Sequence, residues 1–209
     1  LYDTRKKHLR PDSFYEQKDS FCSFIFSNGK ADSGRDAFFL QLNERKHVDS
    51  AGGHLNNMPD GKRVEDKMKF LESYRFNIAF EPTRMNGYIT EKITDAFAGG
   101  AIPIYSGGNG IEKDFNPKAM IDVSRFSSLE ECIDYILYVD SHPEEYMKII
   151  REPAFAKDNS LDREYEQKIL DFAHSIFDRE SIPVLRSTYW DRPKGSEQKE
   201  SALTASLNK

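Results

Sequence analysis

The feature that most constrains the fold is a series of short apolar runs, separated by segments long enough to form helices. The runs cover 21–26, 76–80, 101–105 and 120–123. Short runs rich in Phe, Ile and Val that end at turn residues are typical of buried strands. Strands that alternate with helices build βαβ units, in which the strands lie parallel. The sequence therefore predicts an α/β fold with a Rossmann-like parallel sheet and flanking helices.

The segments between and after these runs carry helical patterns. We expect helices over 33–46, 64–73, 90–98, 128–140, 143–151 and 162–178. Thr90 can cap the third of them, and the glycines at 99–100 supply its stop signal. Residues 48–62 are rich in Gly, Asn, Asp and Pro, which predicts a loop. Pro103 indicates that the strand over 101–105 lies at a sheet edge or that the proline is near a strand end.

The two ends of the chain differ from this alternating middle. Residues 1–20 are charged and irregular in pattern, so we expect a connector. Residues 181–209 form a tail that becomes polar and poor in aromatic residues, and we expect it to be flexible. The middle, 21–180, is then one domain of ordinary size with helices at its carboxyl end.

The charge balance narrows the class of ligand. The sequence has 30 Lys and Arg against 35 Asp and Glu, for a formal net charge of −5. A protein that binds a nucleic-acid backbone shows a basic surplus, so we expect no nucleic-acid partner. A small phosphorylated ligand stays compatible, because a few well-placed cations are enough to hold it.

Metal and disulfide chemistry find little support in the sequence. The five histidines, His8, His47, His54, His142 and His174, show no ligand spacing, so we expect no metal site. Cys22 and Cys132 are too few for a disulfide scaffold and are most simply core residues. The sequence has no Asn-x-Ser/Thr sequon, no basic-then-apolar leader and no run near the roughly 20 apolar residues of a membrane span. The small number of cysteines and the lack of a sequon fit a reducing, cytosolic setting.

In a parallel sheet, ligands bind beyond the carboxyl ends of the strands. The loops over 27–35, 81–92 and 106–113 follow the first three predicted strands, so we expect the functional site there. The Ser-Gly-Gly-Asn-Gly turn at 106–110 either lets backbone amides approach a phosphate or is a plain strand-to-helix turn. It is not a dinucleotide-binding fingerprint.

The densest run of distinctive residues lies between Arg75 and Val123. It contains FE at 80–81, GYITEK at 87–92, IPIY at 102–105 and DFNP at 114–117. Together these pieces resemble the donor-binding motif of the α1,3/4-fucosyltransferases, family 10 of the glycosyltransferases, and its bacterial members most of all. The resemblance extends from about residue 21 to about residue 177.

The resemblance implies a fold and an activity. The family has two Rossmann-like domains facing one cleft, the arrangement called GT-B, and the chain is similar to its C-terminal, GDP-fucose-binding half. The amino-terminal acceptor domain is then missing. The implied reaction is metal-independent transfer of L-fucose from GDP-fucose, with inversion, to an N-acetylglucosamine-containing glycan such as N-acetyllactosamine or lipopolysaccharide. No cofactor is implied, and the sequence has no Asp-x-Asp pair of the kind that holds a metal ion in many other glycosyltransferases.

The implied location depends on the source. For a bacterial protein we expect the cytoplasm, at the membrane periphery for lipopolysaccharide acceptors. For a eukaryotic protein we expect the Golgi lumen.

The resemblance also assigns roles to named residues. Arg35 and Lys92 contact the diphosphate, and a cation there would neutralise the charge that grows as the donor bond breaks. Lys92 lies near the amino end of a helix, where the macrodipole also favours an anion. Glu91, with Glu81 as a further candidate, would stabilise the oxocarbenium character of the departing sugar, and Tyr88 would stack on or hydrogen-bond the nucleotide or sugar.

Simpler explanations exist for these residues. Charged residues are common at solvated helix starts, an arginine can be an ordinary surface residue, and a loop tyrosine often only packs. The family usually has Asn after the Phe-Glu pair, and this chain has Pro82 there. A proline has neither the side-chain amide of asparagine nor a backbone N–H donor. The alternatives are therefore a non-catalytic nucleotide-sugar-binding module, or a transferase that uses another GDP-sugar.

Overall fold

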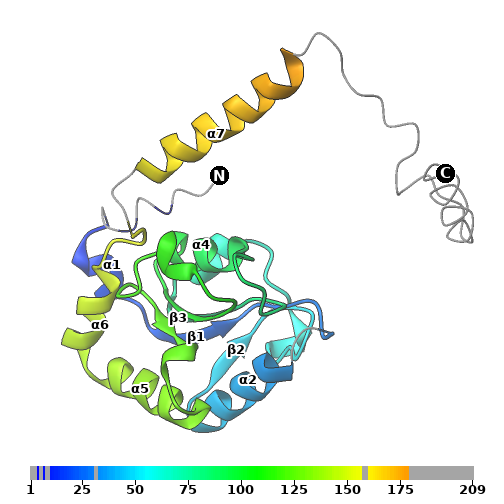
Figure 1. Ribbon diagram of the computed structural model, residues 1–209. Helices are drawn as coiled ribbons and strands as arrows, with labels where there is room; N and C mark the ends of the chain where they lie inside the picture. The colour runs from blue at the N-terminus through cyan, green and yellow to red at the C-terminus, as the bar shows by residue number, and fades with distance from the viewer. Residues whose placement is uncertain (1–3, 5–6, 8–9, 31–32, 157–159, 179–209) are drawn as a thin grey trace, which may run out of the picture. The chain divides into compact units, whose positions relative to one another are not determined.

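The computed structural model describes residues 4, 7, 10–30, 33–156 and 160–178. The helices and strands follow one another as α1 (Asp12–Glu16), β1 (Ser20–Phe24), α2 (Ser33–Arg45), β2 (Val48–Ser50), α3 (Lys67–Leu71), β3 (Tyr74–Phe80), α4 (Glu91–Ala98), β4 (Ile102–Ser106), β5 (Ile121–Asp122), α5 (Leu129–Ser141), α6 (Pro143–Ile150) and α7 (Ser160–Phe177) (Figure 1). Single 3-10 turns lie at Pro59–Gly61, Ile111–Lys113 and Val123–Arg125. The chain divides into two units after Leu161, and the first unit holds the whole sheet.

The sheet has five parallel strands in the order β2-β1-β3-β4-β5. From β1 the chain moves to β2 on one side, then returns past β1 to β3 on the other side. Helices α2 and α5 cover one face of the sheet, and α4 covers the other (Figure 1). The expected α/β fold with a parallel sheet is confirmed.

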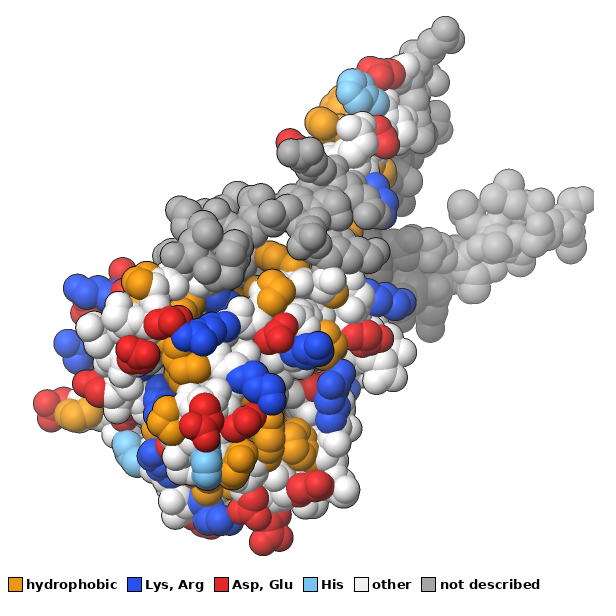
Figure 2. All heavy atoms as spheres, turned by 90° about the vertical axis from the view of Figure 1, so that its left-hand side faces the viewer, with side chains coloured by type: hydrophobic (Ala, Val, Ile, Leu, Met, Phe, Trp, Pro, Cys, Tyr) orange, Lys and Arg blue, Asp and Glu red, His pale blue; other side chains and the backbone are white. Residues whose placement is uncertain are grey.

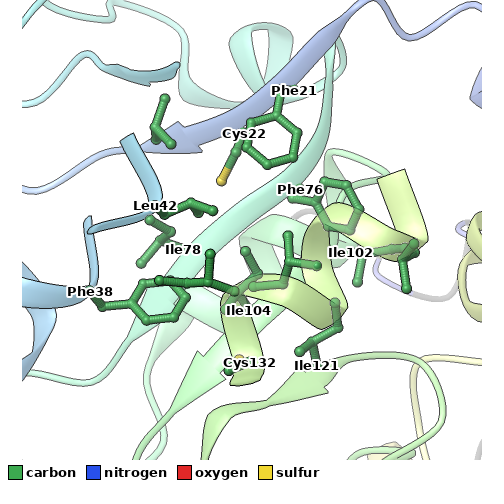
Figure 3. Packing of buried hydrophobic residues seen from close by; sticks show 14 of the residues in the cluster. Phe21, Cys22, Phe38, Leu42, Phe76, Ile78, Ile102, Ile104, Ile121 and Cys132 are labelled. Carbon is green, nitrogen blue, oxygen red and sulfur yellow. The ribbon is translucent and has the colours of Figure 1, made fainter. Parts of the chain in front are cut away.

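Strand β4 shows how the sequence pattern builds both faces. Ile102 and Ile104 point into the larger core, which includes residues of α2 and α5 (Figure 3). Tyr105 points the other way, into a smaller core with Ile93 and Phe97 of α4. Successive side chains of a strand alternate between its faces, so an all-apolar strand fits only a sheet that is covered on both sides.

Cys22 and Cys132 are both buried in the larger core as free thiols (Figure 3). Burial raises the pKa of Cys132 to about 12 and also raises the pKa of Cys22. Both therefore remain protonated and behave as small apolar residues, as the sequence predicted.

Strand β2 lies where the sequence predicted a loop. Its outward-facing backbone groups are bonded by two asparagines rather than by another strand. The Val48 amide donates to Asn43 Oδ1 at 2.9 Å, and the Val48 carbonyl accepts from Asn57 Nδ2 at 2.8 Å. The Ser50 amide donates to Asn57 Oδ1 at 2.7 Å, and the Ser50 carbonyl accepts from the Asn57 amide at 3.1 Å. The polar composition that suggested a loop therefore supports a short edge strand.

Pro103 does not mark a sheet edge, because β4 lies between β3 and β5. It is the second residue of β4, and β5 pairs only with Ile104 and Tyr105. The missing amide donor of Pro103 therefore removes no bond between the two strands.

The described part of the segment expected to be an irregular connector packs against the domain. It contains α1, and the side chains of Tyr15 and Lys18 are buried. Lys18 Nζ donates to the carbonyls of Leu71, Glu72 and Gly99 at 3.4, 2.6 and 3.3 Å. These carbonyls lie at the carboxyl ends of α3 and α4, where backbone carbonyls have no partner within their own helix. One lysine thus joins the ends of two helices.

The sequence also led to expectations about the tail, a membrane span and nucleic-acid binding. The tail at 181–209 lies outside the described residues. Within the described residues, no helix combines the length and the hydropathy needed to cross a bilayer. On the face shown in Figure 2, basic and acidic side chains are interspersed, without the broad basic patch that a nucleic-acid backbone would need.

We predict that Lys18 makes the stability of the domain rise with pH. Burial, helped by repulsion from Arg10, lowers the pKa of Lys18 from 10.5 to about 7. Between these values the unfolded chain holds a proton that the folded chain lacks, so the free energy of unfolding rises with pH by up to about 1.4 kcal/mol per unit. Urea unfolding at pH 7, 8 and 9 measures this slope.

The matched variants are Lys18→Met, which should lower the slope by up to about 1.4 kcal/mol per unit, and Lys30→Met, which changes an exposed lysine and should keep it. The part of the slope that remains in Lys18→Met is expected from Lys7, because burial also lowers the pKa of Lys7 to about 7. An unchanged slope in Lys18→Met would show that Lys18 stays protonated in the fold. At pH 9, where Lys18 is neutral in the fold, Lys18→Met should also lower stability, since it leaves the three carbonyls without this donor.

Candidate functional site

The candidate site lies at the carboxyl edge of the sheet, where the strand order reverses between β1 and β3. The loops after these neighbouring strands lead to α2 and α4 on opposite faces, so they diverge, and such a divergence is where α/β sheets bind ligands. Both helices begin at this edge. The structure therefore brings Arg35, in the first turn of α2, to the same edge as Glu91 and Lys92, in the first turn of α4.

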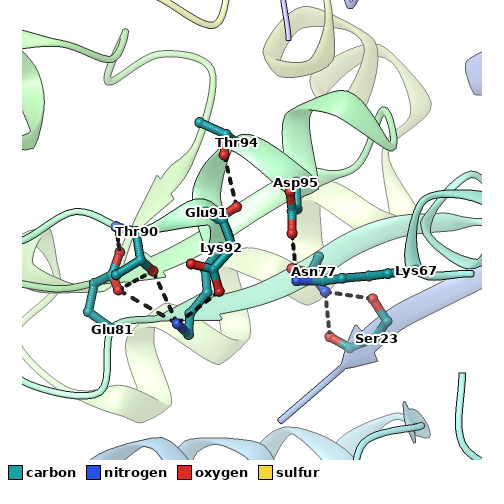
Figure 4. A network of polar contacts seen from close by, with 9 residues as sticks. All are labelled: Ser23, Lys67, Asn77, Glu81, Thr90, Glu91, Lys92, Thr94 and Asp95. Carbon is teal, nitrogen blue, oxygen red and sulfur yellow. Dashed lines mark hydrogen bonds and ion pairs between the residues drawn. The ribbon is translucent and has the colours of Figure 1, made fainter. Parts of the chain in front are cut away.

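Glu81 joins the two ends of the loop between β3 and α4, because it begins the loop and bonds Thr90 at its end (Figure 4). Its side chain is fully buried. Glu81 Oε1 accepts from the Thr90 amide at 2.8 Å, and Oε2 accepts from Thr90 Oγ1 at 2.7 Å. Lys92 Nζ donates to Thr90 Oγ1 at 3.1 Å and lies 3.9 Å from Glu81 Oε2. Both oxygens of Glu81 are thus occupied in fixing Thr90 and, beside it, Lys92.

Thr90 stands at the N-cap position of α4, but its side chain makes no capping hydrogen bond. The expectation that it caps the helix is wrong, because its hydroxyl donates to the buried carboxylate of Glu81 instead. The first backbone N–H groups of α4 therefore point out of the helix end and are not bonded to the Thr90 side chain. Such amides, together with the helix dipole, form a binding position for an anion.

Glu91 and Lys92 stand side by side at the start of α4. Glu91 Oε1 lies 3.5 Å from Lys92 Nζ, and the side chain of Glu91 is 65% exposed against 19% for Lys92. Partial burial would raise the pKa of Glu91, but its own backbone amide, Lys92 and Lys67 together lower it below the ordinary value. Glu91 is therefore a charged, accessible carboxylate at neutral pH, next to a half-buried ammonium.

Arg35 is not a surface residue. Its side chain is 2% exposed and lies under the loop that follows β1. Arg35 Nη2 donates to the Asn28 carbonyl at 2.9 Å, Nε donates to Asp36 Oδ1 at 3.0 Å, and the guanidinium lies 4.5 Å from the centre of the Phe26 ring. Asp36 also contacts His54. The cation is thus held in one orientation from several sides.

The turn at 106–110 packs tightly against the loop before α4. A Cβ on Gly107 would lie 2.2 Å from the Tyr105 hydroxyl, and one on Gly108 would lie 2.1 Å from the Met85 carbonyl oxygen. The glycines are therefore needed for close packing. This supports a plain strand-to-helix turn rather than a turn whose amides approach a phosphate. Tyr88, in the same loop region, is half-buried.

The structure adds roles that the sequence did not indicate for Thr90 and Asp36. Thr90 links Glu81 to Lys92, and Asp36 links Arg35 to His54. The only signal for them was their position beside predicted site residues. Among the residues that the structure describes, no group of three or more His, Cys, Asp or Glu is placed to hold a metal ion.

Comparison with known proteins gives this site a family. The model of the glycosyltransferase family 10 (fucosyltransferase) C-terminal domain matches residues 15–167. An alpha-(1,3)-fucosyltransferase, FucT of Helicobacter pylori, is 38% identical over 183 residues, which are 84% of this chain and 36% of that protein. A GDP-fucose protein O-fucosyltransferase 3 of Gallus gallus is 35% identical over 133 residues, which are 59% of this chain and 28% of that protein.

Solved structures agree with the sequence comparisons. A crystal structure of an alpha1,3-fucosyltransferase with GDP-fucose superposes with a TM-score of 0.70 at 36% identity. A structure of an alpha1,3-fucosyltransferase with GDP gives 0.71 at 38% identity. Each superposition covers 79% of this chain and 49% of the solved chain, so the chain spans about half the length of these relatives. The chain belongs to glycosyltransferase family 10, the fucosyltransferases, and contains the C-terminal domain of that family.

Proposed function

We propose that the chain binds GDP-fucose at the carboxyl edge of its sheet and supplies the donor half of an inverting fucosyl transfer to an N-acetylglucosamine-containing glycan. The observation that carries the proposal is the start of α4, where amides that Thr90 does not cap lie beside Lys92 and the charged carboxylate of Glu91. The solved relatives support it, since two of them hold GDP-fucose and GDP.

The diphosphate is the leaving group in this reaction. When the bond between the fucose carbon and the phosphate oxygen breaks, negative charge grows on the diphosphate and must be stabilised. The amides and dipole of α4 supply part of this stabilisation, and the ammonium of Lys92 supplies another part. Arg35 joins them by exchanging the Asn28 carbonyl for a phosphate oxygen at Nη2, while Asp36 keeps its Nε side in place.

The departing fucosyl group carries the opposite charge. Its oxocarbenium character needs a nearby carboxylate, and Glu91 is charged and accessible at the same helix start. Glu81 fits a different task, because both of its oxygens are bonded to Thr90 in the buried loop. We assign it to positioning Lys92, and Tyr88 to lining the nucleotide or sugar.

The acceptor and the general base complete the reaction. The matched part makes up 49% of a solved relative and 36% of the Helicobacter pylori protein, which supports a GT-B arrangement with the acceptor glycan and the base in a second domain across the cleft. N-acetyllactosamine and lipopolysaccharide are the proposed acceptors, and the cytoplasm of a bacterium is the proposed location. The competing candidate is a transferase that uses another GDP-sugar, because Pro82, next to Glu81, lacks the side-chain amide of the asparagine that the family usually has there.

GDP should stabilise the domain without a metal ion. At a hundredfold excess over its dissociation constant, GDP adds about 2.7 kcal/mol to the free energy of unfolding by mass action. Thermal unfolding should therefore shift upward with GDP to the same extent in EDTA and in Mg²⁺. A shift that disappears in EDTA would show that a metal ion bridges the protein and the diphosphate.

Lys92→Ala should weaken GDP binding about tenfold or more and leave guanosine binding unchanged. A hydrogen bond to a charged group contributes about 1.5–3 kcal/mol, and only the diphosphate takes part in it. Isothermal titration calorimetry with both ligands measures the difference. Lys118→Ala, which changes an exposed lysine away from the sheet edge, is the control. GDP binding as tight as in the parent would show that Lys92 is only solvated.

Residues 1–209 alone should bind GDP-fucose but transfer almost no fucose to N-acetyllactosamine. Bringing donor and acceptor together supplies much of the rate in such reactions, and the proposed acceptor site lies outside this domain. Slow hydrolysis of the donor is the most activity expected in a radiolabelled-fucose assay. Robust transfer would place the base among the carboxylates of this domain, with Glu91 as the first to test.

A further inference from the structure

We propose that His54 is a positioning residue for the diphosphate site, which it serves by holding Asp36 and thereby the guanidinium of Arg35. The proposal rests on the proposed function, because it takes Arg35 to bind the diphosphate. His54 lies in the loop after β2, and Arg35 and Asp36 lie in the first turn of α2. Only Arg35 and Asp36 are adjacent in the sequence, and His54 is 18 residues further along the chain.

Asp36 divides its two carboxylate oxygens between two partners. Oδ1 accepts from Arg35 Nε at 3.0 Å and lies 3.0 Å from Arg35 Nη2. Oδ2 lies 2.6 Å from His54 Nε2. Burial alone would raise the pKa of Asp36, but the hydrogen bonds from His54 and Arg35 lower it below the ordinary value. The carboxylate is thus charged at neutral pH, and each oxygen has its own donor.

His54 also supports the other groups around Arg35. Its ring packs on Gly29, where a Cβ would lie 2.7 Å from His54 Nδ1. Its backbone amide donates to the Phe26 carbonyl at 2.8 Å. The Phe26 ring lies beside the guanidinium, and Asn28 in the same loop supplies the carbonyl that Arg35 Nη2 contacts. One histidine therefore contacts both the carboxylate and the loop that hold the arginine.

The way Asp36 is shared decides which part of Arg35 a ligand can use. With Oδ2 on His54, Asp36 holds Arg35 through one oxygen, Oδ1, which lies 3.0 Å from both Nε and Nη2. The Nη2 bond to the Asn28 carbonyl is then the one that a phosphate oxygen can replace. Without His54, the carboxylate is free to turn and bind the guanidinium with both oxygens, the stronger arrangement. Arg35 would then be neutralised more fully and turned away from the diphosphate.

The test compares three variants of His54 in the full 209-residue chain, with GDP and guanosine as ligands in calorimetry. His54→Leu removes the donor to Asp36 and should weaken GDP binding about fivefold to tenfold. His54→Gln carries an amide donor at about the position of Nε2 and should bind GDP within about twofold of the parent. Guanosine should bind equally to all, since it has no diphosphate.

A comparison of His54→Asn with His54→Gln tests the inference even if His54→Leu does not fold. His54→Asn is as polar as His54→Gln but too short to reach Asp36, so it should show the loss of GDP affinity that the glutamine does not. Equal GDP affinity in the asparagine and glutamine variants overturns the inference. A loss of guanosine affinity that matches the loss of GDP affinity also overturns it, because the role would then be only structural.

The same experiment separates this inference from the proposed function. If the parent binds GDP and Lys92→Ala weakens it, but the His54 variants bind as the parent does, the inference alone is wrong. If the parent does not bind GDP, the proposed function is wrong, and the role of His54 is wrong with it.

Discussion

The reversal of the strand order between β1 and β3 is the constraint on which the rest of this domain depends. Because the chain leaves β1 toward one face of the sheet and leaves β3 toward the other, α2 and α4 begin at neighbouring loops from opposite sides. Two helix amino ends therefore meet at one edge. Each helix carries one cation in its first turn, Arg35 in α2 and Lys92 in α4.

The two loops at this edge use the same physical device. In each, a carboxylate below the loop holds a cation in place: Glu81 acts on Lys92 through Thr90, and Asp36 acts on Arg35 directly. Ion pairs between exposed side chains contribute about 0–1 kcal/mol, whereas removal of one partner of a buried pair costs about 3–5 kcal/mol. Burial is therefore what fixes these cations before a ligand arrives, and groups that are already ordered lose less entropy on binding.

The sequence predicted the parts of this arrangement that follow from periodicity and from the rules of parallel sheets. The strands β1, β3 and β4 were evident from their apolar runs, and the parallel topology placed the loops after them at one edge. Contacts between loops distant in sequence could not be predicted in this way. The bond from Thr90 to Glu81 overrides the usual capping preference of threonine, and the contact of His54 with Asp36 depends on how the loop after β2 folds over the loop after β1. Lys18 was missed because a charged residue in a charged segment gives no sign of burial.

The two asparagines along β2 have a consequence for how this domain behaves when many copies are crowded together. An edge strand with unpaired backbone groups is a template on which another chain can add a strand, and so a starting point for aggregation. Asn43 and Asn57 occupy the outward-facing donors and acceptors of Val48 and Ser50, so no open ladder is left there for a second molecule. The opposite edge is β5, which at two residues is too short to serve as such a template. Side-chain amides thus protect one edge of the sheet from pairing with another chain, and the short length of β5 protects the other edge. Neither edge needs a partner strand for this protection.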